Sequence, residues 1–176
     1  MQVAVYDDAG GSHASRLWWI LRWLGHDAVA VIDGGWSCWI KEERPFSSEV
    51  LIAEGKEFIA SPRPGWTVTA EEILKDLNSP QTCLLDARSS QRFRGENEKL
   101  DPVAGHIPGA YSAPFTENLE ENGNWKSKSE LRQKYEKLLH SCPPEKAVSY
   151  CGSGITACHN ILAMYHAGLG DSRLYP

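Results

Sequence analysis

The stretch that decides the fold reads Val148-Ser149-Tyr150-Cys151-Gly152-Ser153-Gly154-Ile155-Thr156-Ala157. It predicts a short buried strand that ends at a cysteine, followed by a glycine-rich loop that leads directly into a helix. Gly152 and Gly154 allow the backbone to curl tightly and to turn its N–H groups inward, because glycine tolerates positive φ and has no Cβ atom. We therefore expect a ring of backbone N–H donors around the thiol of Cys151.

A thiol at this place also lies at the positive end of a helix dipole, which stabilises an anion on sulfur. The pKa of Cys151 is therefore expected to fall and the nucleophilic thiolate to be favoured. Ser153 and Thr156 add hydroxyl donors at the rim of the loop. The alternative is a small buried side chain without chemistry, the common state of a free cysteine. The order of strand, cysteine, glycines, hydroxyls and helix favours the nucleophile.

The loop could hold phosphate or a sulfur oxyanion, which are both tetrahedral anions. Cysteine phosphatases close such a loop with an arginine six positions after the cysteine, and this chain has Ala157 there. A loop built mainly from backbone donors suits a persulfide on Cys151 better. In this stretch the sequence resembles the rhodanese family, and CGSGITA is most similar to the loops of mercaptopyruvate and thiosulfate sulfurtransferases.

The resemblance extends to motifs upstream of the loop. They are Leu84-Leu85-Asp86-Ala87-Arg88, read as a buried strand that ends in an acid and a base, and the turn Gly105-His106-Ile107-Pro108-Gly109-Ala110. Between them, Arg92-Phe93-Arg94-Gly95 resembles the segment that supplies the family's substrate-binding arginine, which carries over to Arg92. A guanidinium fork suits a carboxylate or sulfonate-like group. The alternative for Arg92 is a surface arginine paired with Glu96 or Glu98.

The resemblance implies roles for further residues. Asp86 and Arg88 are expected to hold the surrounding loops together through hydrogen bonds and an ion pair, and His106 is expected to be structural. No Cys/His partner stands at ligand spacing from His106, so no metal is expected, and no cofactor either. Some mercaptopyruvate enzymes carry a second arginine where this chain has Asp101. The residues expected to bind substrate are Arg92, Gly152, Ser153, Gly154, Ile155 and Thr156.

Composition limits the classes of function. The chain has 176 residues, a net charge of −5 and no clustered basic stripe, which argues against nucleic acid as a partner. The five cysteines form no CxxC pair and are odd in number, so a reducing compartment is expected. No signal sequence and no apolar run of the ~20 residues that span a membrane is present. The cytoplasm is the expected location, with small-molecule sulfur donors and acceptors as partners.

An internal repeat predicts the domain organisation. Val3 to Asp33 and Val148 to Pro176 both read as strand, loop, helix, glycine and strand, with Asp7 at the position that matches Cys151. We expect residues 1–46 to be the latter part of an inactive rhodanese-like domain and 67–176 to be a catalytic one that lacks its last short element. Residues 47–66, rich in proline and charge, read as a linker.

The predicted fold class is α/β, a rhodanese-like domain with a mostly parallel sheet flanked by helices, preceded by part of a second such domain. Helices are expected over Ser12 to Leu24, Thr67 to Leu77 and Ser127 to Leu139. The last of them is expected to carry a Glu130–Lys134 ion pair on its solvent-exposed face. The apolar residues of the first helix lie around most of its circumference, so it must be buried on more than one side. We expect the second domain, a second copy of this chain or the rest of a longer natural polypeptide to cover it.

The resemblance implies a sulfurtransferase. The Cys151 thiolate would take sulfur from thiosulfate or 3-mercaptopyruvate, hold it as a persulfide, and pass it to cyanide or a thiol. Two alternatives remain open at this point. One is a sulfur-carrying or regulatory binding module with little turnover, and the other is a cysteine phosphatase, which Ala157 disfavours.

Overall fold

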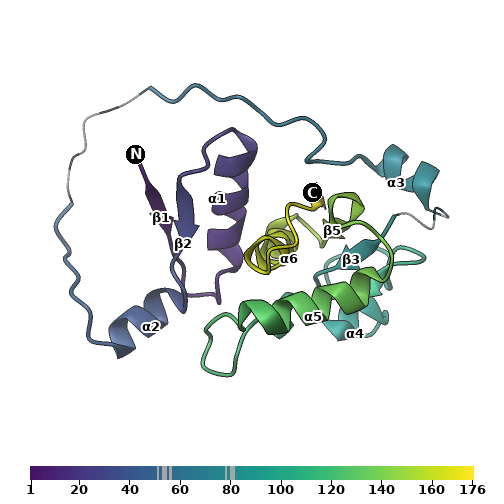
Figure 1. Ribbon diagram of the computed structural model, residues 1–176. Helices are drawn as coiled ribbons and strands as arrows, with labels where there is room; N and C mark the ends of the chain where they lie inside the picture. Colours follow the sequence, from purple (N-terminus) through teal and green to yellow (C-terminus); the bar gives the residue numbers. More distant parts are fainter. Residues whose placement is uncertain (51, 53–54, 56, 78, 80–81) are drawn as a thin grey trace.

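The computed structural model is an α/β protein with two parallel sheets (Figure 1). It describes residues 1–50, 52, 55, 57–77, 79 and 82–176. The N-terminal unit, as we name the part from β1 to α2, holds a two-stranded sheet, β1–β2. Its elements are β1 (Val3–Val5), α1 (Ser12–Trp23), β2 (Val29–Val31) and α2 (Gly35–Lys41).

The C-terminal unit, from α3 to β6, holds a four-stranded sheet in the order β4-β3-β5-β6, and every strand pair in it is parallel. Its elements are α3 (Ala70–Asp76), β3 (Leu84–Asp86), α4 (Ser90–Phe93), β4 (Tyr111–Ser112), η1 (Phe115–Asn118), α5 (Lys128–Leu139), η2 (Pro144–Lys146), β5 (Val148–Tyr150), α6 (Ile155–His166) and β6 (Arg173–Tyr175). The alternation of short apolar strands with helices produces this order, because parallel neighbours need a crossover between them. The predicted α/β class, with parallel sheets flanked by helices, is confirmed.

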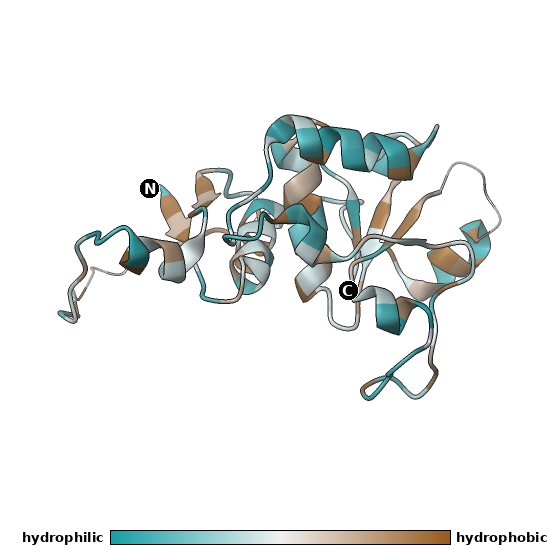
Figure 2. Cartoon of the chain, turned by 90° about the horizontal axis from the view of Figure 1, so that it is seen from below, coloured by the Kyte–Doolittle hydropathy of each residue, from teal (hydrophilic) through white to brown (hydrophobic). Residues whose placement is uncertain are grey.

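The sheet of the C-terminal unit is buried on both faces. One apolar cluster joins Leu85 to Leu131 and Tyr135 of α5 and Met164 of α6, and all four side chains are fully buried. Figure 2 shows the strands coloured mainly as hydrophobic. The two central strands, β3 and β5, are buried at every position, whereas the edge strands β4 and β6 are buried only in part. This burial also fixes the carboxyl ends of β3 and β5, where the predicted site residues lie.

Helix α1 packs against α6, so the two units share a core. Trp18 and Trp19 of α1 lie in one apolar cluster with Cys158 and Ile161 of α6, and Figure 1 shows the two helices side by side. Both tryptophans are 2% exposed. The expected cover for this tryptophan-rich helix is therefore supplied in part by the C-terminal unit. Leu17, on another side of α1, remains 44% exposed.

Two details of the helices differ from prediction. The helix expected over Thr67 to Leu77 begins only at Ala70, because Thr69 is its N-cap and forms a capping box with Glu72. The expected Glu130–Lys134 pair is wrong. Glu130 instead caps its own helix by accepting hydrogen bonds from Ser127, and an Arg132–Glu136 pair lies at that spacing.

Lys134 points inward, to the Asn118 side-chain oxygen at 2.9 Å and to the Glu117 carboxylate at 3.5 Å. A lysine read from sequence as part of a solvated face is thus half-buried. Periodicity alone does not reveal this, because the acceptors belong to η1, which lies earlier in the chain than α5.

The predicted linker at 47–66 contains residues 51, 53–54 and 56, which lie outside the described residues. Its described part has no helix or strand and runs as a long connection between α2 and α3 (Figure 1). Two backbone hydrogen bonds attach its end to α1, from Ser61 N–H to Leu24 and from Arg63 N–H to Trp23. In the part of the chain that the structure describes, no helix is long and apolar enough to cross a membrane.

Candidate active site

Cys151 follows β5 directly and begins the predicted loop. The loop ends at Gly154, whose φ of 72° lies in the left-handed region and which is the N-cap of α6. Gly152 and Ser153 are exposed, whereas Gly154 is buried. A Cβ atom at Gly152 would meet no described atom within 4 Å. One side of the loop is therefore open to an incoming molecule, while the other faces the protein.

The environment of the Cys151 thiol favours its ionised form. Burial raises its pKa, but hydrogen bonds from the Thr156 hydroxyl and from the backbone N–H groups of Ser153, Ala157 and Thr156 outweigh burial, and the pKa lies below its ordinary value. The sulfur thus receives three backbone N–H groups, from the loop and from the first turn of α6. Ala157 was not among the predicted binding residues, because its side chain carries no chemistry and its contribution is a backbone N–H.

The N-terminal unit contains a second loop of this kind. The Asp7 carboxylate accepts backbone hydrogen bonds of 2.7 to 2.9 Å from Ala9, Gly11, His13 and Ala14. Burial raises the pKa of Asp7, and these four bonds outweigh burial and lower it. In this loop the backbone N–H groups donate hydrogen bonds to a carboxylate, and in the matching loop they donate to the sulfur of Cys151. Both loops are therefore built to stabilise an anion.

Asp86 and Arg88 form a buried ion pair. Arg88 Nη2 lies 2.7 Å from Asp86 Oδ2 and donates to the backbone oxygen of Gly105 at 2.6 Å. The hydrogen bond to Asp86 raises the pKa of Arg88 above its ordinary value. Because Asp86 lies beside Tyr150 in the parallel register, this pair ties the segment after β3 and the turn at Gly105 to the strand that carries Cys151.

Arg92 is also held by carboxylates. Its Nε donates to Glu98 at 2.9 Å and its Nη2 donates to Asp101 at 2.8 Å. The ion pair with Glu98 is the one expected under the alternative that Arg92 is a surface arginine. The ion pair with Asp101 is a second one, which that alternative did not include. Arg88 contacts the same two carboxylates, at 3.4 Å and 3.1 Å. A donor anion that used Arg92 would therefore compete with Glu98 and Asp101.

His106 lies in the turn before β4. Its Nδ1 is 2.6 Å from the backbone oxygen of Phe93, and its ring stacks on the Phe93 ring at 3.7 Å. The neighbouring Ile107 N–H donates to the Tyr150 hydroxyl at 3.2 Å. These contacts attach the turn to α4 and β5. Among the described residues, no group of three or more His, Cys, Asp or Glu side chains could hold a metal ion.

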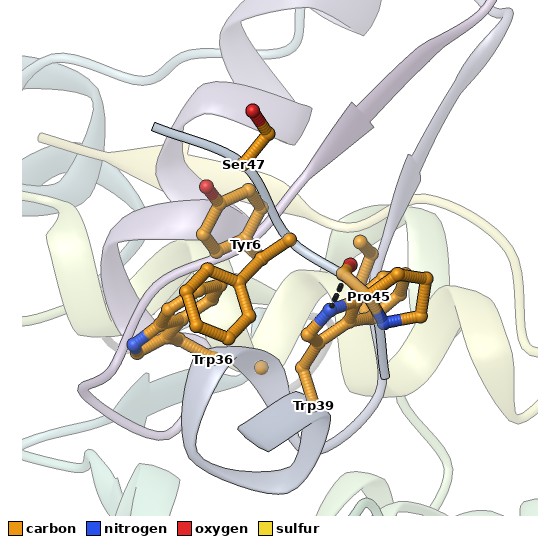
Figure 3. Close-up of a pocket in the computed structure, with 8 residues that line it drawn as sticks. Tyr6, Trp36, Trp39, Pro45 and Ser47 are labelled. Carbon is orange, nitrogen blue, oxygen red and sulfur yellow. Dashed lines mark hydrogen bonds between the residues drawn. The ribbon is translucent and has the colours of Figure 1, made fainter. Parts of the chain in front are cut away.

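A pocket of about 270 Å³ lies elsewhere, between the N-terminal unit and residues 45–47, which follow α2. Figure 3 shows Tyr6, Trp36 and Trp39 around it, with the Trp39 ring N–H donating to the backbone oxygen of Pro45 at 3.0 Å. Phe46 also lines it and is 70% exposed. Its lining includes no residue of the Cys151 loop. The chemistry at Cys151 and this aromatic pocket are therefore separate features.

Comparison with known proteins identifies the family. The family model for the rhodanese-like domain matches residues 1–42 and 69–175 of this chain. The chain is 42% identical to the probable 3-mercaptopyruvate sulfurtransferase of Pseudomonas aeruginosa, in an alignment that covers 99% of the chain. It is 37% identical to the bovine thiosulfate sulfurtransferase, in an alignment that covers 98% of the chain. The crystal structure of SseA from Escherichia coli superposes with a TM-score of 0.83 at 30% identity and covers 99% of the chain.

The chain spans only part of these proteins: 62% of the Pseudomonas relative, 60% of the bovine one and 65% of the SseA chain. The family model covers both units and includes the loops that hold Asp7 and Cys151. On the strength of this match and of the fold, the chain belongs to the rhodanese-like domain family.

Proposed function

We propose that this chain transfers a sulfane sulfur from an anionic donor to a thiophilic acceptor through a persulfide on Cys151. The observation that carries the proposal is the thiol of Cys151, which receives three backbone N–H groups and the Thr156 hydroxyl and has a lowered pKa. A thiolate is the form that attacks sulfur. The exposed Gly152 and Ser153 give a donor access to it.

The reaction has two steps. The Cys151 thiolate attacks the transferable sulfur of the donor, the bond between that sulfur and the rest of the donor breaks, and the electron pair leaves with the remainder. The outer sulfur of the persulfide then receives the attack of cyanide or a thiol, which regenerates the thiolate. The ring of N–H groups stabilises negative charge on sulfur before and after each step.

The donor class follows from the family and from charge. The named relatives are 3-mercaptopyruvate and thiosulfate sulfurtransferases, and both donors are anions. In the proposal, Arg92 orients the donor, and the loop from Gly152 to Thr156 surrounds it. Asp86, Arg88 and His106 support the surrounding segments through the contacts described above.

The proposal includes the organisation and setting of the chain. Residues 1–46 would be the latter part of a domain without a nucleophile, 47–66 a linker, and 67–176 the catalytic domain. The family match to 1–42 and 69–175 supports this division. A thiol nucleophile works best in a reducing compartment, so we place the chain in the cytoplasm.

The proposal is tested by intact mass. The reduced protein is exposed to thiosulfate or 3-mercaptopyruvate, freed of excess donor, and weighed before and after addition of cyanide. We expect a mass gain of one sulfur atom that cyanide removes, with thiocyanate formed in equal amount. A protein that gains no sulfur from either donor, or from a polysulfide, would overturn the proposal.

A binding module with little turnover is the second candidate, and the contacts of Arg92 favour it. Glu98 and Asp101 already occupy this guanidinium, so an anionic donor has to displace a carboxylate. Such a module would take up sulfur once and release it slowly. Thiocyanate formation over many turnovers separates the two candidates, because only the enzyme continues beyond one sulfur per chain.

A further inference from the structure

We infer that Arg16, in the N-terminal unit, is a positioning residue for the Cys151 loop of the C-terminal unit: its guanidinium supports the loop from the protein side and supplies a positive charge to it. The inference rests on the proposed function. It gives the unit that lacks a nucleophile a part in the chemistry of the unit that has one.

The contacts place the guanidinium of Arg16 directly against the loop. Arg16 Nη1 lies 3.6 Å from the sulfur of Cys158, in the first turns of α6. A Cβ atom added to Gly154 would lie 2.9 Å from Nη1 and 3.5 Å from the guanidinium carbon. Gly154 is the residue at which the loop turns into α6. Arg16 therefore packs on the turn that aims the N–H groups of Thr156 and Ala157 at the thiol.

The charge of Arg16 is not neutralised nearby. Within the described part of the chain, no ion pair includes Arg16, whereas Arg22 of the same helix pairs with Asp171. Cys158 does not supply a negative charge, since burial raises the pKa of this thiol to about 12. The guanidinium carbon of Arg16 lies over the Trp19 ring, 5.5 Å from the ring centre. A half-buried and unpaired cation beside a loop of N–H donors strengthens its attraction for an anion.

The matching contact in the other direction supports this interpretation. When Asp7 is set against Cys151 with one residue inserted, Arg16 of α1 corresponds to His159 of α6. The His159 Nε2 lies 3.0 Å from the backbone oxygen of Gly10, in the Asp7 loop. Each helix thus delivers one polar side chain to the loop of the other unit. Burial lowers the pKa of His159 to about 4, so the loop that already holds a carboxylate receives a neutral partner.

The pairing follows the charge that each loop has to hold. The Asp7 loop carries a fixed anion, which its own four N–H groups satisfy. The Cys151 loop holds an anion only when the thiol is ionised or the persulfide is formed, and it receives the permanent cation. Arg16 does not need to touch the donor for this effect, because it acts through Gly154 and through the field at the loop.

The test measures the ionisation of Cys151 without relying on turnover. The rate of Cys151 alkylation by iodoacetamide is followed against pH by peptide mass spectrometry in the wild type, Arg16→Gln, Arg16→Lys and the control Arg132→Gln. Arg132 is an exposed residue of α5 that pairs with Glu136. Persulfide formation from thiosulfate is measured in parallel across the same pH range.

We expect Arg16→Gln to raise the apparent pKa of Cys151 and to slow its alkylation at neutral pH at least threefold, with recovery at high pH. Persulfide formation should fall by a similar factor and recover with it. Arg16→Lys should retain most of the wild-type behaviour, and Arg132→Gln should retain all of it. Arg16→Met, whose side chain is also long and unbranched but carries no charge, replaces the Gln variant if that variant does not fold.

An alkylation profile of Arg16→Gln or Arg16→Met that coincides with the wild type would overturn the inference. So would an equal loss at all pH values, because that result indicates a structural role alone. Failure of the proposed function has a different signature: the wild type would form no persulfide, while the alkylation profiles would still differ between Arg16 variants.

Discussion

Cys151 and Cys158 show how position decides the reactivity of a thiol at the scale of a single residue. Cys151 has a lowered pKa and a partly exposed side chain, whereas burial raises the pKa of Cys158 to about 12. We predict that Cys151→Ser abolishes sulfur uptake from thiosulfate and that Cys158→Ser retains it. Intact mass after a donor pulse measures both. Wild-type uptake by Cys151→Ser would show that another residue carries the sulfur.

Arg92 is expected to bind the donor rather than to take part in bond making. We predict that Arg92→Ala raises the KM for thiosulfate or 3-mercaptopyruvate and leaves kcat nearly unchanged. The rise in KM should be equivalent to about 1.5 to 3 kcal/mol, the free energy of a lost charged hydrogen bond. Steady-state kinetics over a range of donor concentrations measures this. With an unchanged KM, Arg92 would be a surface residue that pairs with Glu98.

Asp101 occupies one end of the Arg92 fork, at 2.8 Å from Nη2, and its side chain is 38% exposed. We predict that Asp101→Asn lowers the KM for an anionic donor several-fold, because the guanidinium then has one fewer carboxylate to release. Glu96→Gln is the matched control, since Glu96 pairs with Arg94 at an exposed position. Equal kinetics for both variants would mean that Asp101 does not compete with the donor.

At the scale of elements, a buried polar network joins α6 to the N-terminal unit. The Asn118 side-chain oxygen accepts from Lys134 and Tyr135, so its amide nitrogen donates to His159 Nδ1 at 3.1 Å. His159 Nε2 therefore carries the hydrogen that is donated to Gly10. This geometry suits only the neutral imidazole. Lys134 and Asp7 act on the pKa of His159 in opposite directions, and burial dominates in lowering it to about 4.

We predict that the network makes folding sensitive to acid. The unfolded chain protonates this histidine near pH 6.5 and the folded chain near 4, so the folded state binds fewer protons between these values and loses stability as the pH falls. The loss is at most about 3 kcal/mol. Denaturant unfolding at pH 7 and pH 4.5 measures it. The His159→Gln variant should lose less stability on acidification than the wild type, and an identical loss in both would contradict the prediction.

Most elements could be predicted from sequence, because their signals are local. The strand before Cys151 and the helix after it follow from an apolar run, two glycines and a change of period, and they lie where expected. The start of the helix predicted over Thr67 to Leu77 is misplaced, because Thr69, and not Thr67, has a glutamate three residues later that completes the capping box.

At the scale of the whole molecule, contacts between distant segments could not be predicted. Arg16 and Cys158 are separated by 142 positions, and helical periodicity shows which residues of α1 are apolar but not which loop its polar residues meet. The sequence indicates only one of the two carboxylates on Arg92. Glu98 is a predicted partner, whereas Asp101 stands out in the sequence only as a departure from a family pattern. Each of these contacts depends on how the two units pack.

The N-terminal unit is expected to be the least protected part of the molecule. Its sheet has only two strands among the described residues, and each pairs on one edge. Around the aromatic pocket, Tyr6 and Phe46 are 55% and 70% exposed. Such a sheet is marginal by itself, because few contacts offset the entropy of ordering it. Helix α1 is held better, through its core with α6.

We therefore predict that amides of β1, β2 and α2 exchange with solvent much faster than those of α6, or that the purified chain self-associates and covers them. Hydrogen exchange resolved by peptide measures the first outcome, and sedimentation over a range of concentrations measures the second. Binding of an apolar dye should accompany exposure of the aromatic pocket and should fall in Phe46→Ser, which removes one ring from it. A monodisperse monomer with strong protection across residues 1–46 and no dye binding would refute the prediction, and would mean that packing of α1 on α6 is sufficient to hold the whole N-terminal unit.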